Sequence, residues 1–156
     1  EFVNLINFEA YYKNNEQLYH KFINEVEEHI KNKQLWQFVR NYVGINSNFN
    51  YLVNLLPYNT GGNYGAIVGN NVYCNLRIRL TPNLKESTFI GSNPATFDSM
   101  IVHEFSHPFI NPLTDKYIEH ISQKVFANIR EKMKQLPYNL KQTLINEHVI
   151  RALRLG

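Results

Sequence analysis

The chain has 156 residues, of which 44% are hydrophobic and 19% charged, a composition typical of one globular domain that can bury a core without metal or disulfides. Its formal charge of +3 comes from Lys and Arg side chains scattered along the chain, a pattern that argues against nucleic-acid binding. The single cysteine, Cys74, excludes an internal disulfide and a Cys-rich zinc site, and no apolar run approaches the about 20 residues that span a membrane.

The two ends of the sequence indicate that it is part of a longer protein. It begins at Glu1 without Met and shows no signal peptide, and it stops at Gly156 directly after a predicted helix. We therefore expect one domain over residues 1–156, with further sequence outside it.

The first half of the chain is predicted to be mostly helical, up to the turn-forming stretch at residues 60–65. Apolar residues recur every four positions over residues 18–30, which indicates an amphipathic helix of about four turns. A second apolar set at residues 35–43 ends at Gly44, and a third at residues 49–56 ends at Pro57. Because Gly and Pro commonly terminate helices, we predict helices for these two segments as well.

Strands are predicted after a turn-forming stretch at residues 60–65. Apolar and polar residues alternate strictly over residues 72–80, which predicts a strand with one buried face. A shorter run at residues 87–90 is expected to pair with it in a small antiparallel sheet. The Gly-rich stretch lacks the Lys-Ser/Thr ending of a phosphate-binding loop, so we interpret it as a turn.

The most informative motif follows on a helix that is predicted to begin at Asn93-Pro94, a capping side chain followed by Pro at the first helical position. Its residues His103 and His107 are four positions apart, so both imidazoles lie on one helix face and could bind one zinc ion. Glu104 lies beside them and could take a proton from a metal-bound water.

Two further helices are predicted beyond the motif. Pro108 disfavours helical geometry at the preceding residue, so we expect the metal helix to end or kink there. Helices at residues 115–133 and 139–153 follow, and Asp115 is expected to cap the first of them. These elements predict an α+β fold, mostly helical, with the small antiparallel sheet preceding the metal helix.

A third metal ligand is needed, because catalytic zinc usually has three protein ligands and one water. A third His shortly downstream is excluded, since the third and sixth positions after His107 are Ile110 and Leu113. We favour Glu147 on the last helix. Arg151, one turn later, either orients that carboxylate or forms an ordinary helical ion pair with it. The alternative third ligands are Asp115, Glu119, His120 and His148.

The sequence around the motif resembles a known family. The string from His103 to Leu113 is similar to the motif His-Glu-Phe-x-His-x-Phe-x-Asn-Pro of a family of predicted bacterial metallopeptidases. Residues 146–152 are similar to the family's second motif, in which the Glu is taken as the third zinc ligand. More weakly, residues 1–6 resemble the family's opening helix and residues 45–56 the helix before its sheet.

The resemblance implies a gluzincin, a zinc peptidase whose third ligand is Glu. It implies Zn²⁺ held by His103, His107 and Glu147, Glu104 as general base, a peptide or protein substrate, and a bacterial protein that is exported or lies at the cell surface. The substrate is then expected to bind as an extended strand along residues 72–80 or along the edge at residues 61–69.

Three questions stay open in the sequence. The donor that stabilises the negatively charged oxygen of the reaction is one of Tyr64, Tyr73, Tyr117, Tyr138 and His148. The protein could instead be a metal-binding or protein-interaction module without catalysis. It could also be a zinc hydrolase that acts on a non-peptide amide or ester, because the metal chemistry is shared.

Overall fold

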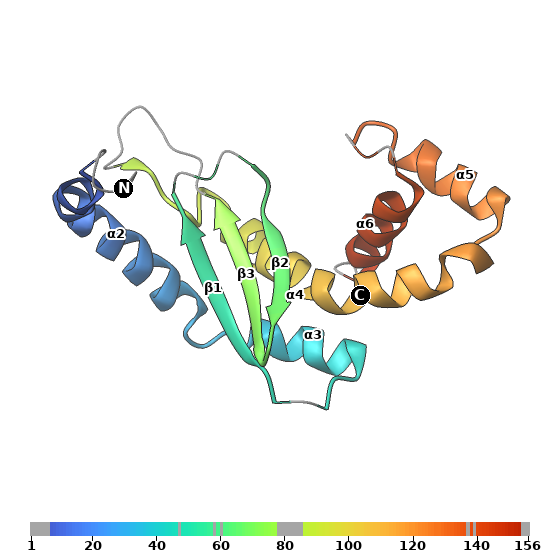
Figure 1. Cartoon of the computed structure of the whole chain (residues 1–156), viewed down its shortest axis with the longest axis horizontal. Coiled ribbons are helices and arrows are strands. Elements are labelled where there is room, and N and C mark those ends of the chain that lie inside the picture. The colour runs from blue at the N-terminus through green and yellow to red at the C-terminus, as the bar shows by residue number, and fades with distance from the viewer. Residues whose placement is uncertain are drawn as a thin grey trace.

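The computed structural model of the chain describes residues 7–46, 48–57, 59, 61–77, 86–136, 138 and 140–153. The chain combines helices with a small three-stranded sheet, so the predicted α+β class is confirmed (Figure 1). In chain order the elements are α2 (Phe8–Ile30), α3 (Leu35–Val43), β1 (Asn50–Leu56), β2 (Tyr64–Val68), β3 (Asn71–Arg77), α4 (Pro94–Tyr117), the 3₁₀-helix η2 (Ile118–His120), α5 (Gln123–Lys132) and α6 (Lys141–Leu153).

The sheet has the strand order β1-β3-β2. β2 and β3 pair antiparallel through a two-residue turn that begins at Gly69 with a φ of 59°, a conformation that glycine adopts without strain. β1 is added in parallel on the other side of β3. The strand predicted at residues 72–80 is thus the central one, although its last three residues lie outside the described part of the chain.

The prediction of a helix at residues 49–56 is wrong, because this segment forms β1. A short apolar run does not by itself distinguish a buried helix from a strand. Here the side chains alternate: Tyr51, Val53 and Leu55 pack against the core. On the opposite face, Asn54 Nδ2 donates to Asn75 Oδ1 of β3 at 2.9 Å. Pairing with β3 therefore decides the conformation.

The short run at residues 87–90 was predicted to pair with the sheet, and it does not. Its backbone is irregular, and the segment packs on α2 instead. Lys21 Nζ donates to the carbonyl oxygen of Ser87 at 2.8 Å, and the Phe89 ring meets Phe22 edge-on at a centroid distance of 5.2 Å.

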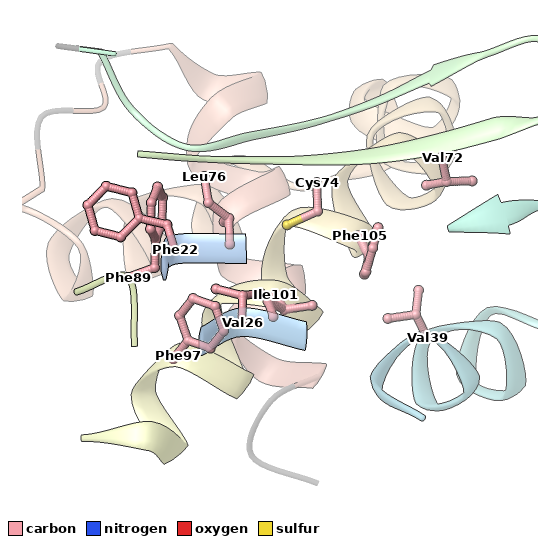
Figure 2. Packing of buried hydrophobic residues seen from close by; sticks show 10 residues of the cluster. All are labelled: Phe22, Val26, Val39, Val72, Cys74, Leu76, Phe89, Phe97, Ile101 and Phe105. Carbon is pink, nitrogen blue, oxygen red and sulfur yellow. The ribbon is translucent and has the colours of Figure 1, made fainter. Parts of the chain in front are cut away.

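The main core lies between one face of the sheet and helices α2, α3 and α4. Figure 2 shows the side chains of Phe22 and Val26 from α2 gathered with Phe97, Ile101 and Phe105 from α4. The same cluster includes Val39 of α3, Val72, Cys74 and Leu76 of β3, and Phe89. Because α4 contributes three aromatic or branched side chains to this core, its orientation under the sheet is firmly determined.

Helix α4 is longer than predicted. It begins as expected, with the Asn93 side chain accepting from the amides of Ala95 and Thr96, but it continues through Pro108 and Pro112 to Tyr117. Of the two outcomes predicted at Pro108, an end of the helix or a kink, the end is wrong, because the proline removes one backbone donor without preventing the following turns. Past the sheet, α4 runs on to α5 and α6 (Figure 1).

The helix predicted at residues 115–133 is divided into the end of α4, η2 and α5. Asp115 lies in the last turn of α4 and caps nothing, while Ser122 caps α5 by accepting from the amide of Val125 at 3.3 Å. The last predicted helix is confirmed as α6. Among the described residues, no helix is long and apolar enough to cross a membrane.

Candidate metal centre

The two imidazoles of the motif converge on one point beside α4. His103 and His107 are one helical turn apart, and their Nε2 atoms lie 3.1 Å from each other. His103 is buried, with 8% of its surface exposed, and His107 is mostly buried. Two nitrogens that face each other at this distance need a shared proton or a shared cation between them.

Glu147 of α6 reaches the same point. Its Oε2 lies 3.5 Å from His103 Nε2, and its Oε1 lies 3.5 Å from His107 Nε2. The carboxylate is there because α6 packs on α4: Ile110, Ile150 and Leu153 form a buried cluster between the two helices. The Thr114 hydroxyl also donates to the Asn146 side chain, next to Glu147.

These distances fit a tetrahedral zinc site. With metal–ligand bonds of about 2.0–2.1 Å, two ligands of a tetrahedral ion are about 3.3–3.4 Å apart. The Nε2 atoms of His103 and His107 are 3.1 Å apart, and each lies 3.5 Å from a different oxygen of Glu147, Oε2 for His103 and Oε1 for His107. The donor set of two imidazoles and one carboxylate also matches a catalytic zinc with one position left for water.

Glu104 is the other carboxylate at this point. Its Oε2 is 3.9 Å from His107 Nε2, and His103, Glu104 and His107 also offer three possible ligand atoms within 4.8 Å of one another. Glu147 is the better candidate for a third ligand, because its carboxylate is closer and approaches both imidazoles. Glu104 is buried, and its Oε2 has no hydrogen-bond partner among the described residues.

The environment shifts the pKa of both carboxyls. Burial raises the pKa of Glu104 to about 7, with His103 lowering it and the charge of Glu147 raising it further. Burial also acts to raise the pKa of Glu147, but hydrogen bonding to His103 and the charges of His103, His107 and Arg151 outweigh it and leave the pKa lowered. The two carboxyls thus differ in their pKa: Glu147 is held as an anion, and Glu104 can exchange a proton near neutral pH.

Two side chains orient the candidate ligands. Asn111 Oδ1 lies 3.2 Å from His107 Nδ1, which places the ring proton there and leaves Nε2 free to bind a metal. Burial lowers the pKa of His107, although the bond to Asn111 opposes this. Arg151 Nη2 donates to Glu147 Oε2 at 3.2 Å, the contact predicted from the sequence.

The cluster opens into a polar cleft of about 290 Å³. Tyr138 lies on its wall and interacts with the side chains of Arg151 and Glu147; burial raises the pKa of its phenol, and the charge of Glu147 adds to this. The remaining lining comes from Gly62, Asn63 and Met100. A larger apolar hollow of about 470 Å³ lies between α2 and β1 and contains none of these groups.

Comparison with protein families agrees with a domain that occupies nearly the whole chain. The sequence model of a domain of unknown function, DUF4932, matches residues 1–155. The chain belongs to the DUF4932 family. No curated protein and no solved structure matches it significantly.

In this DUF4932 domain the alternative third ligands lie outside the cleft. Asp115, Glu119 and His120 are exposed around the end of α4 and in η2, and His148 lines a separate hollow beside α5. Of the five candidate donors to the reacting oxygen, Tyr138 alone is among the side chains that line the cleft.

Sequence reasoning missed Asn111 in the DUF4932 domain. It lies four positions after His107, the spacing at which helical side chains meet, so a signal was available. The signal was lost because the helix was expected to end at Pro108.

Proposed function

We propose that this chain is a zinc-dependent peptidase of the gluzincin type. The observation that supports it best is the convergence of two imidazoles, whose Nε2 atoms are 3.1 Å apart, with the Glu147 carboxylate, which places one oxygen 3.5 Å from each of them. Beside them lies the buried Glu104, whose Oε2 has no hydrogen-bond partner among the described residues. His103 and His107 from α4 and Glu147 from α6 would hold Zn²⁺, which when bound lowers the pKa of a water molecule and polarises the scissile carbonyl.

Glu104 is the general base in this proposal. Glu104 lines the cleft, and a pKa of about 7 suits a group that must accept a proton from water and then return it to the leaving amine. Arg151 holds the Glu147 carboxylate in place through the 3.2 Å hydrogen bond. The Tyr138 hydroxyl is positioned in the cleft to donate to the carbonyl oxygen as negative charge develops on it.

The substrate is an extended peptide that pairs with β2. Among the described residues, β2 is paired on one edge only, whereas β3 is central and paired on both, so we favour the edge at residues 61–69 over the alternative along residues 72–80. Gly62 and Asn63, directly before β2, line the cleft. A peptide hydrogen-bonded to the β2 edge would therefore run past the candidate metal ligands.

Glu104 also argues against a metal site without catalysis. A buried carboxyl that is not needed as a ligand costs stability, because burial disfavours its charged form. A protein-interaction module that only needed the metal would gain from an amide or an apolar residue at this position. Hydrolysis of a non-peptide amide or ester would use the same groups and differs only in how the substrate binds.

Metal analysis combined with Glu104→Gln tests the proposal. We expect one zinc per chain in both proteins, peptide hydrolysis by the wild type, and a loss of about 10²–10⁴-fold in the variant, the usual contribution of a general base. Lack of stoichiometric zinc in the wild type would refute the mechanism. A library of extended peptides, assayed beside small esters and amides, identifies the substrate class.

A further inference from the structure

Strand β2 lies directly against the backbone of the metal helix at Gly65. A Cβ atom built on Gly65 would overlap with the carbonyl oxygen of Glu104 and would lie 2.8 Å from Pro108 Cδ. Any other residue at this position would have to push the strand and the helix apart. The contact is therefore possible only because residue 65 is glycine.

Pro108 explains why the Glu104 carbonyl is available for this contact. In a continuous helix the amide of residue 108 would donate to the carbonyl of residue 104, and proline has no amide hydrogen. The carbonyl oxygen faces Gly65 in β2, where a Cα–H group can approach it closely. Gly65 thus leaves room for the Glu104 carbonyl oxygen, and Pro108 leaves that oxygen without its usual helical donor.

We propose that Gly65 and Pro108 form a positioning contact that sets how close the β2 edge lies to the general base Glu104. The proposal rests on the peptidase function, in which β2 carries the substrate strand. Neither residue touches the reacting atoms; both act through the distance between the bound peptide and the catalytic carboxyl. The proline that seemed to interrupt the motif helix becomes part of how the substrate strand is placed.

Widening the contact should move β2 and leave the metal helix in place. In the part of the chain that the structure describes, β2 is a five-residue edge strand that pairs with β3 alone, whereas α4 is anchored in the core through Phe97, Ile101 and Phe105. The candidate metal ligands lie on α4 and α6, so they keep their geometry. A displaced edge carries the peptide away from Glu104, and a misplacement of about 1 Å costs about 10²-fold in rate.

The test is Gly65→Ala, compared with the wild type and with Val39→Ala, a buried α3 variant that lowers stability without touching the contact. We expect Gly65→Ala to bind zinc like the wild type and to lose about 10²-fold in kcat for extended peptides with KM nearly unchanged. Val39→Ala should keep its kcat. Unchanged kcat in zinc-loaded Gly65→Ala, or an equal loss of zinc binding and activity, overturns the proposal.

Hydrogen exchange in the metal-free protein separates this proposal from the peptidase function. Amides of β2 should exchange faster in Gly65→Ala and also in Pro108→Ala, where the restored amide draws the Glu104 carbonyl back into the helix; amides of α6 should not change. If Gly65→Ala does not fold, Pro108→Ala decides alone. If β2 exchanges faster in the variants but the wild type hydrolyses no peptide, the peptidase function is refuted and the contact is not. If β2 exchange is unchanged in the variants, the proposed contact is refuted.

Discussion

Replacing Glu147 with Ala is expected to remove most of the thermal stabilisation that zinc confers on this chain. The Glu147 carboxylate lies 3.5 Å from both imidazole Nε2 atoms, so it supplies one of three candidate protein ligands. Zinc binding to four-ligand sites is worth about 10–16 kcal/mol, or about 2.5–4 kcal/mol per ligand. Losing one ligand should therefore weaken zinc binding about 10²–10³-fold.

The effect on melting temperature follows from mass action. At a free zinc concentration about 100-fold above the wild-type Kd, binding stabilises the folded chain by about 2.7 kcal/mol. For a chain of this size, that raises Tm by about 5–11 °C. The same zinc concentration is only about 0.1–1 times the Kd of Glu147→Ala, which gives about 0.1–0.4 kcal/mol and a rise of less than about 2 °C.

Thermal unfolding with chelator and with buffered zinc measures this rise for each protein. Comparing the zinc-induced rise within each variant cancels the effect of Glu147→Ala on the metal-free chain. Glu119→Ala is the matched control, because it removes an exposed carboxylate that was an alternative ligand, and it should keep the full rise. A rise of about 5–11 °C in Glu147→Ala would refute the assignment of Glu147 as the third ligand.

Three further predictions concern single side chains of the site and core. Tyr138→Phe should lower kcat by about 10²-fold with zinc content unchanged, because one donor to the developing charge is lost; equal kcat would show that another group stabilises the oxygen. In the metal-free protein, Glu104→Gln should be stabilising at high pH. Since the pKa of Glu104 is raised from 4.5 to about 7, the folded chain loses stability relative to the unfolded chain as pH rises from about 4.5 to 7, on the order of 3 kcal/mol in total. Urea unfolding with chelator at pH 4.5 and pH 8 should show that Glu104→Gln raises the free energy of unfolding by this amount only at pH 8. An equal difference between variant and wild type at both pH values would contradict the raised pKa of Glu104. Cys74 is fully buried, and burial, with a smaller contribution from the Glu104 charge, raises the pKa of its thiol. A thiol reagent should therefore react with Cys74 only as fast as the chain unfolds locally, and more slowly when zinc is added. Rapid reaction with the native protein would contradict this burial.

Local rules were sufficient where a feature depends on residues within a few turns. The Asn93 cap, the end of α3 at Gly44 with a φ of 72°, and the shared face of His103 and His107 all follow from helix geometry. These features need no partner from elsewhere in the chain, so the sequence alone predicts them. The metal-binding and catalytic roles of the motif remain predictions.

Local rules failed where a distant partner decides. Residues 50–56 are apolar enough for a helix or a strand, and pairing with β3 makes them a strand. Pro108 is unfavourable within a helix, yet the helix continues, and β2 packs against the carbonyl that the proline leaves without its usual donor. In both cases the structure depends on contacts with residues that are distant in the sequence.

The His103-Glu104-x-x-His107 motif and its face were determined by the sequence, because their spacing is set by one helix. The sequence alone did not determine which carboxylate lies beside the two imidazoles. Glu147 comes from forty residues further along and reaches the two imidazoles only because α6 packs on α4 through a buried cluster and the bond from Thr114 to Asn146. Convergence over such a separation depends on how the two helices pack, and only the tertiary structure contains that information.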